Sequence, residues 1–152
     1  MRRLTGVFVA FGLIALLAAG AARAEELIMV RSPQPFPETI DGLQRLIQEH
    51  GYKVQRVQRV DVGLAAKGFK TDFYRVVFFG KPEETRRLAN LHPELIPYLP
   101  LKIVVFAEEN TTLALTNNPV LLGTFFKDSE LAVYFRRWER DIRSILDHVA
   151  ND

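Results

Sequence analysis

The stretch LKIVVFAEENTTLALT, residues 101–116, decides the fold that we predict from the sequence. Residues 101–107 are almost all apolar, which is typical of a strand buried on both faces in the middle of a sheet. A polar turn follows at residues 108–110, and residues 111–116 form a second strand pattern. Because two strands joined by so short a turn pair antiparallel, we expect a β-hairpin here.

Segments with strand and helix patterns surround this hairpin, without internal repeats. The last segment, residues 129–149, has apolar residues at helical spacing, and Ser129 is a suitable N-cap. In the strand expected at 52–60 the valines fall three apart, which a β-bulge would reconcile. The other expected elements are strands at 27–31 and 73–79, helices at 37–50 and 82–91, and a short helix or loop at 62–69. Together they predict an α+β domain, with helices packed on a mainly antiparallel sheet.

Residues 1–24 have the composition of a secretory signal peptide. Two arginines precede an uncharged, mostly apolar run over residues 4–22, which ends in an A-x-A pattern at residues 22–24. The strongly apolar part is shorter than the ~20 residues that a helix needs to cross a bilayer, which favours cleavage over a retained anchor. We therefore expect cleavage after Ala24 and a mature, periplasmic single domain of residues 25–152.

Removal of this segment changes the charge argument. The full chain has 20 basic and 18 acidic residues, and cleavage removes three arginines and no acids, which leaves 17 basic residues and a net charge of −1. We predict no nucleic-acid binding, because it needs a basic face that persists in the mature protein. The chain has no cysteine, which excludes disulfides, thiolate metal sites and thiol nucleophiles.

The stretch FFGKPEETRRLANL, residues 78–91, looks at first like a phosphate-binding loop. A P-loop needs the spacing G-x-x-x-x-G-K-[ST], whereas a single glycine precedes Lys81. Pro82 removes a backbone N–H donor, and Glu83 and Glu84 place carboxylates in the first helical turn, where they would repel a phosphate. We therefore expect a helix that begins with proline, and no nucleotide.

Polar residues at strand ends give a second hypothesis for this region. Lys102 begins one hairpin strand and Asn118 follows the other, so antiparallel pairing places them at the same rim of the sheet. Lys81 joins them only if its strand runs antiparallel to 101–107, whereas a helical connection usually returns the chain parallel. The candidate binding residues are Lys81, Lys102, Asn118 and Tyr98, and the alternative is that both lysines mark exposed strand ends.

Residues of common catalytic and metal sites are scattered along the chain. His50, His92 and His148 lack metal-site spacing, and interaction with a helix dipole explains two of them. No serine lies in a nucleophile elbow. Carboxylates could act as acid and base only if folding brought them together, and the candidates are Glu38, Asp41, Asp61, Asp72, Glu108 and Glu109. We predict no catalytic residue, no metal and no cofactor.

The C-terminal helix offers a basic face. Arg136, Arg140 and Arg143 share one side of it, which suits lipid headgroups or an acidic partner. Glu139 and Asp141 interleave with them, which favours an ordinary solvated surface. We expect the aromatic residues of this region in the core, with some left to line a pocket: Phe125, Phe126, Tyr134, Phe135 and Trp138.

Three short motifs in a fixed order give a resemblance to a known family. Residues 79–82 read FGKP, residues 99–102 read LPLK, and Asn118-Pro119 follows the hairpin. They resemble the FGNP, LPLK and NDP motifs of domain-of-unknown-function family 302, over roughly residues 27–122, after a helix that exits through Gly51-Tyr52. The resemblance implies a compact α+β fold of the TATA-box-binding-protein-like type and, as an open alternative, a homodimer. It implies no activity.

Two positions depart from the family pattern. Many members carry an Asp-His pair where this chain has Asp61-Val62, and Lys81 stands where Asn is more common. A role for that histidine does not transfer to this chain. The closer likeness is to members with G-Y-K, Y-R-V-V-F-F-G-K and P-Y-L-P-L-K, found here at residues 51–53, 74–81 and 97–102.

The sequence favours a binding domain. The leading hypothesis is recognition of a small apolar or amphipathic ligand, or of a protein partner, in a cleft between the sheet and the C-terminal helix. One alternative is an enzyme that uses scattered carboxylates and Lys102 as acid and base. Another is a structural role through a dimer face.

Export generates the first testable prediction. The protein recovered from the periplasm should begin at Glu25, because signal peptidase recognises the small residues that precede this position. Intact-mass spectrometry and N-terminal sequencing measure this directly. A periplasmic protein that retains residues 1–24 would contradict cleavage.

Overall fold

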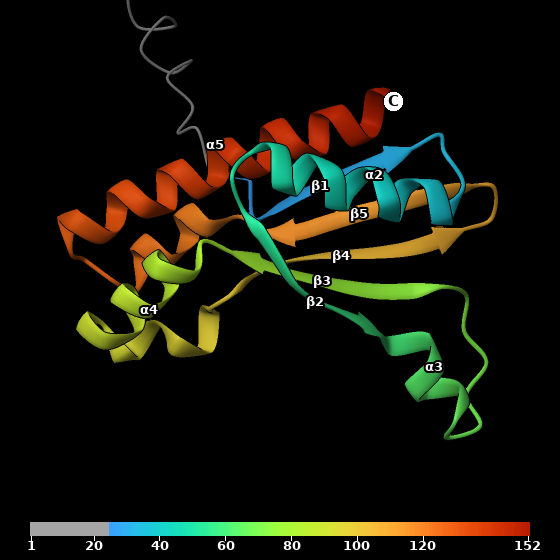
Figure 1. The fold of residues 1–152 in the computed structure, drawn as a ribbon, viewed down its shortest axis with the longest axis horizontal. Coiled ribbons are helices and arrows are strands. Elements are labelled where there is room, and N and C mark those ends of the chain that lie inside the picture. Colours follow the sequence, from blue (N-terminus) through green and yellow to red (C-terminus); the bar gives the residue numbers. More distant parts are fainter. Residues whose placement is uncertain (1–24) are drawn as a thin grey trace, which may run out of the picture.

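A five-stranded sheet with the strand order β1-β5-β4-β3-β2 organises the molecule, and every neighbouring pair of strands is antiparallel. The structure is a computed structural model that describes residues 25–152, so the predicted signal peptide lies outside the described residues. Helices α2 and α5 lie along one face of the sheet, as Figure 1 shows. The predicted α+β architecture with an antiparallel sheet is confirmed.

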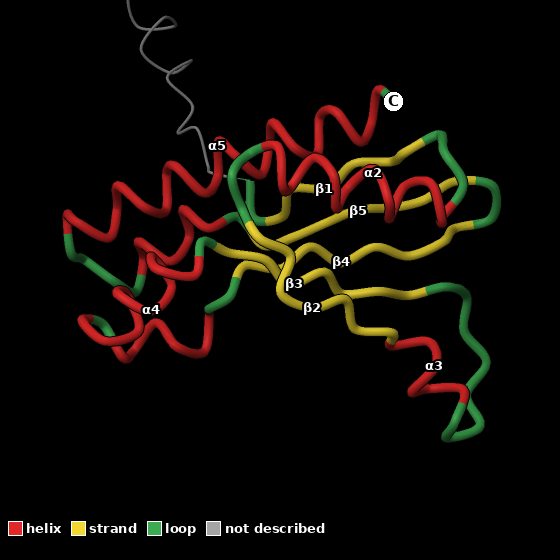
Figure 2. The backbone as a smooth tube through the Cα atoms, viewed as in Figure 1, coloured by secondary structure: helices red, strands yellow, loops and turns green. Residues whose placement is uncertain are grey.

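The elements follow the predicted order closely (Figure 2). The strands are β1 (Leu27–Ser32), β2 (Lys53–Arg59), β3 (Tyr74–Gly80), β4 (Leu101–Glu108) and β5 (Thr111–Asn117). The helices are α2 (Phe36–Glu49), α3 (Val60–Ala65), α4 (Pro82–Leu91) and α5 (Ser129–Asn151), with 3-10 helices η1 (Pro93–Tyr98) and η2 (Pro119–Thr124). None of the helices within residues 25–152 is both long and apolar enough to cross a membrane.

Strand β4 occupies the middle of the sheet, as its apolar sequence predicts. It pairs with β5 through Val104 and Leu115, and with β3 through Ile103 and Val77. The β-bulge expected in the second strand is present, because the register of β2 against β3 shifts between Val54 and Arg56.

Local backbone chemistry fixes two helix ends. Helix α2 ends in a Schellman motif, in which Tyr52 N–H bonds to Ile47 C=O and Gly51 takes a φ of 76° that favours glycine. At the start of α5 the prediction that Ser129 is the N-cap is wrong. The cap is Asp128, whose side chain accepts a hydrogen bond from Glu130 N–H at 2.7 Å, because a carboxylate both caps the helix and favours its dipole.

The core lies between the sheet and the pair α2 and α5. Ile103 and Val105 of β4 point into it and are fully buried, as are Leu43 of α2 and Ile145 of α5. Every second side chain of β4 faces this core, and the side chains between them point to the opposite face of the sheet.

The opposite side of the sheet is apolar but has no helix layer in the described part of the chain (Figure 1). Val104 and Phe106 of β4 and Leu115 of β5 point to this side, stay partly exposed and lie outside the core cluster. On the neighbouring β1 strand, Met29 is 56% exposed. The domain is therefore a two-layer structure with one uncovered sheet face.

Replacement of Ile103 by alanine tests the position of the core. The fully buried side chain leaves a cavity when truncated, so Ile103→Ala should lower the free energy of unfolding by about 2–5 kcal/mol. Urea unfolding followed by circular dichroism measures it. Met29→Ala is the matched control and should change stability by less than about 0.5 kcal/mol. Equal losses in the two variants would contradict the assignment of the two sheet faces.

Candidate functional site

The antiparallel pairing of β3 with β4 places three predicted residues at one rim of the sheet. Phe79 near the end of β3 pairs with Leu101 at the start of β4, because α4 and η1 carry the chain back to the rim that it left. Lys81, Lys102 and Asn118 therefore lie at the same rim, which answers the question that the sequence left open.

A pocket opens at this rim, and we call it the rim pocket. Its volume is about 300 Å³, and its walls come from the end of the sheet, η1, η2 and one residue of α5. Most of the lining is apolar, and the residues are Phe78, 97–102, 116–119, Leu121, Leu122, Phe125 and Ile142. The Leu99–Pro100 peptide bond in its wall is cis. Tyr98, Lys102 and Asn118 of the predicted set all contribute to the pocket.

The location differs from the cleft expected between the sheet and the C-terminal helix. That space is filled by fully buried side chains, among them Ile103 of the sheet and Leu146 of α5. Close packing in the core leaves no room for a ligand there. Only Ile142 of α5 reaches the rim pocket, so the opening lies at the end of the two layers.

Asn118 supports the pocket wall through its own hydrogen bonds. It is 1% exposed, and its Nδ2 donates to Glu25 C=O at 2.9 Å and to Glu139 Oε1 at 3.1 Å. Its Oδ1 accepts from Val120 N–H at 3.0 Å and caps η2. Both amide hydrogens are therefore used within the protein, and the family motif at Asn118 has a structural explanation.

Among the described residues 25–152, Lys102 is the only charged residue that lines the pocket. Its side chain is exposed, and within residues 25–152 it forms no ion pair. Thr116 Oγ1 donates to Lys102 C=O at 2.7 Å and so fixes β5 to β4 next to this lysine. The ammonium group is left free at the edge of an apolar surface.

Two aromatic side chains stand at the mouth of the rim pocket. Phe125 follows directly after η2 and is 74% exposed. Tyr98 is also exposed and packs edge-on against Phe126, with ring centroids 5.7 Å apart. The expectation that this aromatic group belongs to the core holds for Phe135 and Trp138, whereas Phe125 lines the pocket instead.

Lys81 shares the rim but does not line the pocket. Its ammonium group lies 4.8 Å from the ring centroid of Tyr52, which is a cation–π contact. The glycine before it answers a steric need, because a Cβ at Gly80 would lie 3.0 Å from Thr85 Oγ1 and 3.3 Å from Gln55 Nε2. The Gly80-Lys81 turn therefore reflects packing around the start of α4.

The carboxylate of Glu84 belongs to a network that the sequence did not reveal. Glu84 Oε2 accepts from Arg137 Nη2 at 2.5 Å, and its Oε1 accepts from Trp138 Nε1 at 3.0 Å. Beside them, Tyr52 OH donates to Asp141 Oδ2 at 2.5 Å. Burial and this bond to Asp141 raise the pKa of Tyr52 far above its usual range. The network joins α4 and the end of α2 to α5.

The helical spacing of α5 is the one sequence signal for this network, and it does not identify the partners on α4 and near α2. Arg137 lies between Tyr134 and Asp141, on the side of α5 that carries Trp138. The basic face predicted from the sequence consists instead of Arg136, Arg140 and Arg143. Of these, Arg136 and Arg140 are exposed, and Arg143 is bound to Glu139 and Glu25. The surface role proposed for the three arginines stays a prediction.

Four of the six candidate carboxylates lie near the opposite end of β4 from Lys102. Asp61, Asp72 and Glu109 line a separate groove of about 550 Å³, near the end of β4. Lys102 lies at the start of the same strand, so roughly 20 Å separates it from Glu108. Arg75 bonds to Asp61 and lowers the pKa of that carboxyl, which outweighs the burial that would raise it. An acid–base pair of Lys102 with these groups is not assembled.

The histidines have structural contacts. His50 Nδ1 lies 2.8 Å from Leu46 C=O and its Nε2 lies 3.0 Å from Ser144 Oγ, which ties the end of α2 to α5. The ring of His148 is 6.4 Å away, and His92 is near Glu94. Within residues 25–152 no three potential metal ligands come together.

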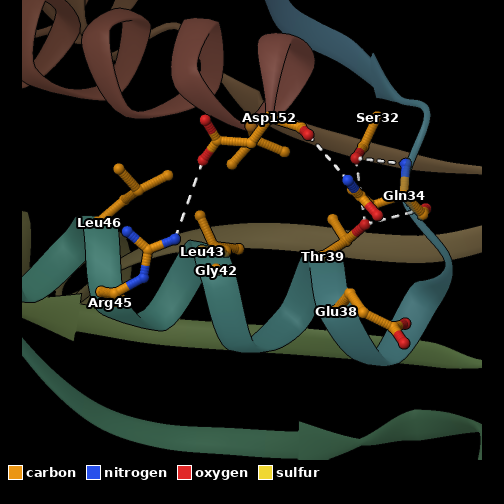
Figure 3. A pocket seen from close by; sticks show the side chains of 10 residues that line it. Ser32, Gln34, Glu38, Thr39, Gly42, Leu43, Arg45, Leu46 and Asp152 are labelled. Carbon is orange, nitrogen blue, oxygen red and sulfur yellow. Dashed lines mark hydrogen bonds and ion pairs between the residues drawn. The ribbon is translucent and has the colours of Figure 1, made fainter.

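A second hollow lies between α2 and the end of α5 (Figure 3). Several of its polar groups bond to one another. Thr39 Oγ1 lies 3.2 Å from Ser32 Oγ, and Gln34 Nε2 donates to Asp152 C=O at 2.7 Å. Arg45 reaches towards the Asp152 carboxylate across the opening. These contacts hold the turn from β1 to α2, so the rim pocket is the better candidate site.

The fold and the rim pocket define a class of protein: a small α+β domain whose helix-covered antiparallel sheet ends in an apolar pocket. Residues 28–149 match the model of the family described as "Domain of unknown function DUF302", and the chain belongs to this family. The match includes α5 as far as residue 149, beyond the region 27–122 that the sequence motifs cover.

A crystal structure from Bacillus stearothermophilus, described as that of an "uncharacterized conserved protein DUF302", is similar to this chain. The TM-score is 0.73 and the sequence identity 25%, over 82% of this chain and 98% of that chain. No curated protein matches the chain. The comparisons therefore show the family and the fold, and they give no activity.

Loss of the Glu84 carboxylate tests the network. Glu84 is 16% exposed and has two donors, so Glu84→Gln should lower the free energy of unfolding by about 1–3 kcal/mol. Chemical unfolding at neutral pH measures it. The matched control is Glu83→Gln, because Glu83 is 84% exposed and pairs with the exposed Arg86. This substitution should lower the free energy of unfolding by less than about 1 kcal/mol. Similar losses for both variants would show that the network does not stabilise α4.

Proposed function

We propose that this protein binds a small apolar or amphipathic molecule in the rim pocket. The observation that carries the proposal is an apolar pocket of about 300 Å³ whose mouth includes Phe125, an aromatic residue that is 74% exposed. Burial of such a side chain against a ligand releases water from apolar surface and stabilises the complex.

The composition of the rim pocket supports binding over catalysis. Its volume lies at the lower end of the range for small-molecule sites, and its lining combines many apolar groups with few polar ones, as such sites usually do. Asn118 and Thr116 already use their hydrogen-bond donors within the protein. The lining residues that the structure describes include no carboxylate and no histidine that could act with Lys102 as an acid–base pair.

The rigid frame of the pocket also supports this proposal. Its walls come from four segments that the core and the Asn118 bonds hold in place. A pocket that exists before its ligand arrives loses little conformational entropy on binding. We further propose that the mature domain acts in the periplasm, on the basis of the signal-peptide pattern in residues 1–24.

A variant that fills the pocket tests the proposal. Leu121 lines the pocket, so Leu121→Trp should occupy its volume and abolish the binding of N-phenyl-1-naphthylamine, a neutral apolar fluorophore. Val133→Trp is the matched control, because Val133 is an exposed residue of α5 outside the lining, and it should bind the probe like the original protein. Fluorescence titration measures binding, and thermal melting shows that both variants are folded.

Native mass spectrometry of protein purified from the periplasm provides an independent measurement. A small molecule that co-purifies with the original chain and is absent from Leu121→Trp would support the proposal. An original protein that is empty and gives no fluorescence change with the probe would contradict it. The same spectra report the oligomeric state and so decide the homodimer alternative.

A further inference from the structure

We infer that the ligand of the rim pocket is a small monoanion, with a short aromatic or aliphatic body and a single carboxylate that binds Lys102. This inference rests on the proposed function and names the chemical class of its ligand. It is carried by the position of the Lys102 ammonium group at an apolar pocket. Within residues 25–152 this group has no ion-pair partner, and the described lining has no acid.

The charge of the lining selects against other ligand classes. In the part of the chain that the structure describes, Lys102 is the only charged residue that lines the rim pocket. A cationic ligand would be repelled by the positive charge there, and a neutral one would gain no ionic attraction from the exposed ammonium group. A carboxylate satisfies it with a charge-assisted hydrogen bond, which is roughly twice as strong as a neutral one.

The hydrogen-bond inventory favours a ligand with few polar groups. Thr116 Oγ1 donates to Lys102 C=O at 2.7 Å, and both amide hydrogens of Asn118 are bound within the protein. Asn117 and Tyr98 are exposed and line the pocket with Lys102, so the Asn117 amide and the Tyr98 hydroxyl are the other side-chain donors that a ligand can reach. A ligand with many polar groups would bury most of them without partners, which is costly.

The aromatic residues place the apolar body of the ligand next to its charge. Phe78 of β3 pairs directly with Lys102 of β4 in the sheet register, and both line the pocket. Tyr98 and Phe125 complete the aromatic surface at the mouth. A volume of about 300 Å³ favours a short body, such as a phenyl ring with a few methylene groups.

Three probes of nearly equal shape separate the charge from the apolar body. They are 4-phenylbutyrate, the neutral 4-phenylbutanol and the cationic 4-phenylbutylammonium ion. Each is titrated into the mature protein by calorimetry and in competition with N-phenyl-1-naphthylamine. We expect 4-phenylbutyrate to bind about tenfold more tightly than the alcohol, with a further loss for the amine. Added salt should bring the affinities of the two charged probes closer to each other and leave the affinity of the neutral alcohol nearly unchanged.

Substitution of the lysine assigns the effect to one residue. Lys102→Gln should lower the affinity for 4-phenylbutyrate about tenfold and leave the affinity for 4-phenylbutanol nearly unchanged. Lys53→Gln is the matched control, because Lys53 is an exposed lysine at the same rim that does not line the pocket. Both side chains are exposed, so both variants should fold, and thermal melting verifies this.

The possible outcomes distinguish the two proposals. Equal binding of the anionic and neutral probes, or an unchanged affinity in Lys102→Gln, would overturn the monoanion and leave an apolar pocket. Stronger binding of the cation would overturn it as well. If neither the fluorophore nor any of the three probes binds, the proposed function fails and the monoanion fails with it.

Discussion

The antiparallel pairing of β3 with β4 is the constraint on which the rest of the structure depends. Once Phe79 lies opposite Leu101, the chain between them must leave and re-enter the sheet at the same rim, and α4 with η1 provides that return. The hairpin of β4 and β5 brings Asn118 to the same place. The rim pocket therefore forms where three strand ends meet, from segments that are distant in sequence.

Polar contacts keep this rim in shape while the core stays apolar. Glu84 holds α4 against Arg137 and Trp138 of α5, and Asn118 fastens η2 to Glu139 of the same helix. Both side chains are largely buried and form their hydrogen bonds within the protein, because a buried polar group without a partner destabilises the fold. Lys102 is different, since nothing in the described residues 25–152 neutralises it and the pocket lies beside it. This contrast between bound and free polar groups is the physical basis of the proposed site.

Particular residues show how far the sequence predicted the site. Lys102 and Asn118 line one pocket because adjacent strand ends in an antiparallel sheet share a rim. Tyr98 joins them from η1, which leads into the start of β4. Lys81 lies at that rim but turns to Tyr52, which local sequence does not encode. The sequence also does not predict the exposure of Phe125, since an aromatic residue near apolar neighbours is found in cores and in pockets alike.

The sequence by itself determined the local elements: strand and helix periods, the bulge in β2, the glycine after α2 and the central hairpin, because these follow from backbone preferences and the spacing of apolar residues. The family motifs also lie in the sequence, and the matched family confirms them. Only the tertiary structure decided the direction of β3 against β4, the partnership of Glu84 with Arg137 and the place of the pocket. These depend on contacts between residues far apart in the chain, which no local pattern specifies.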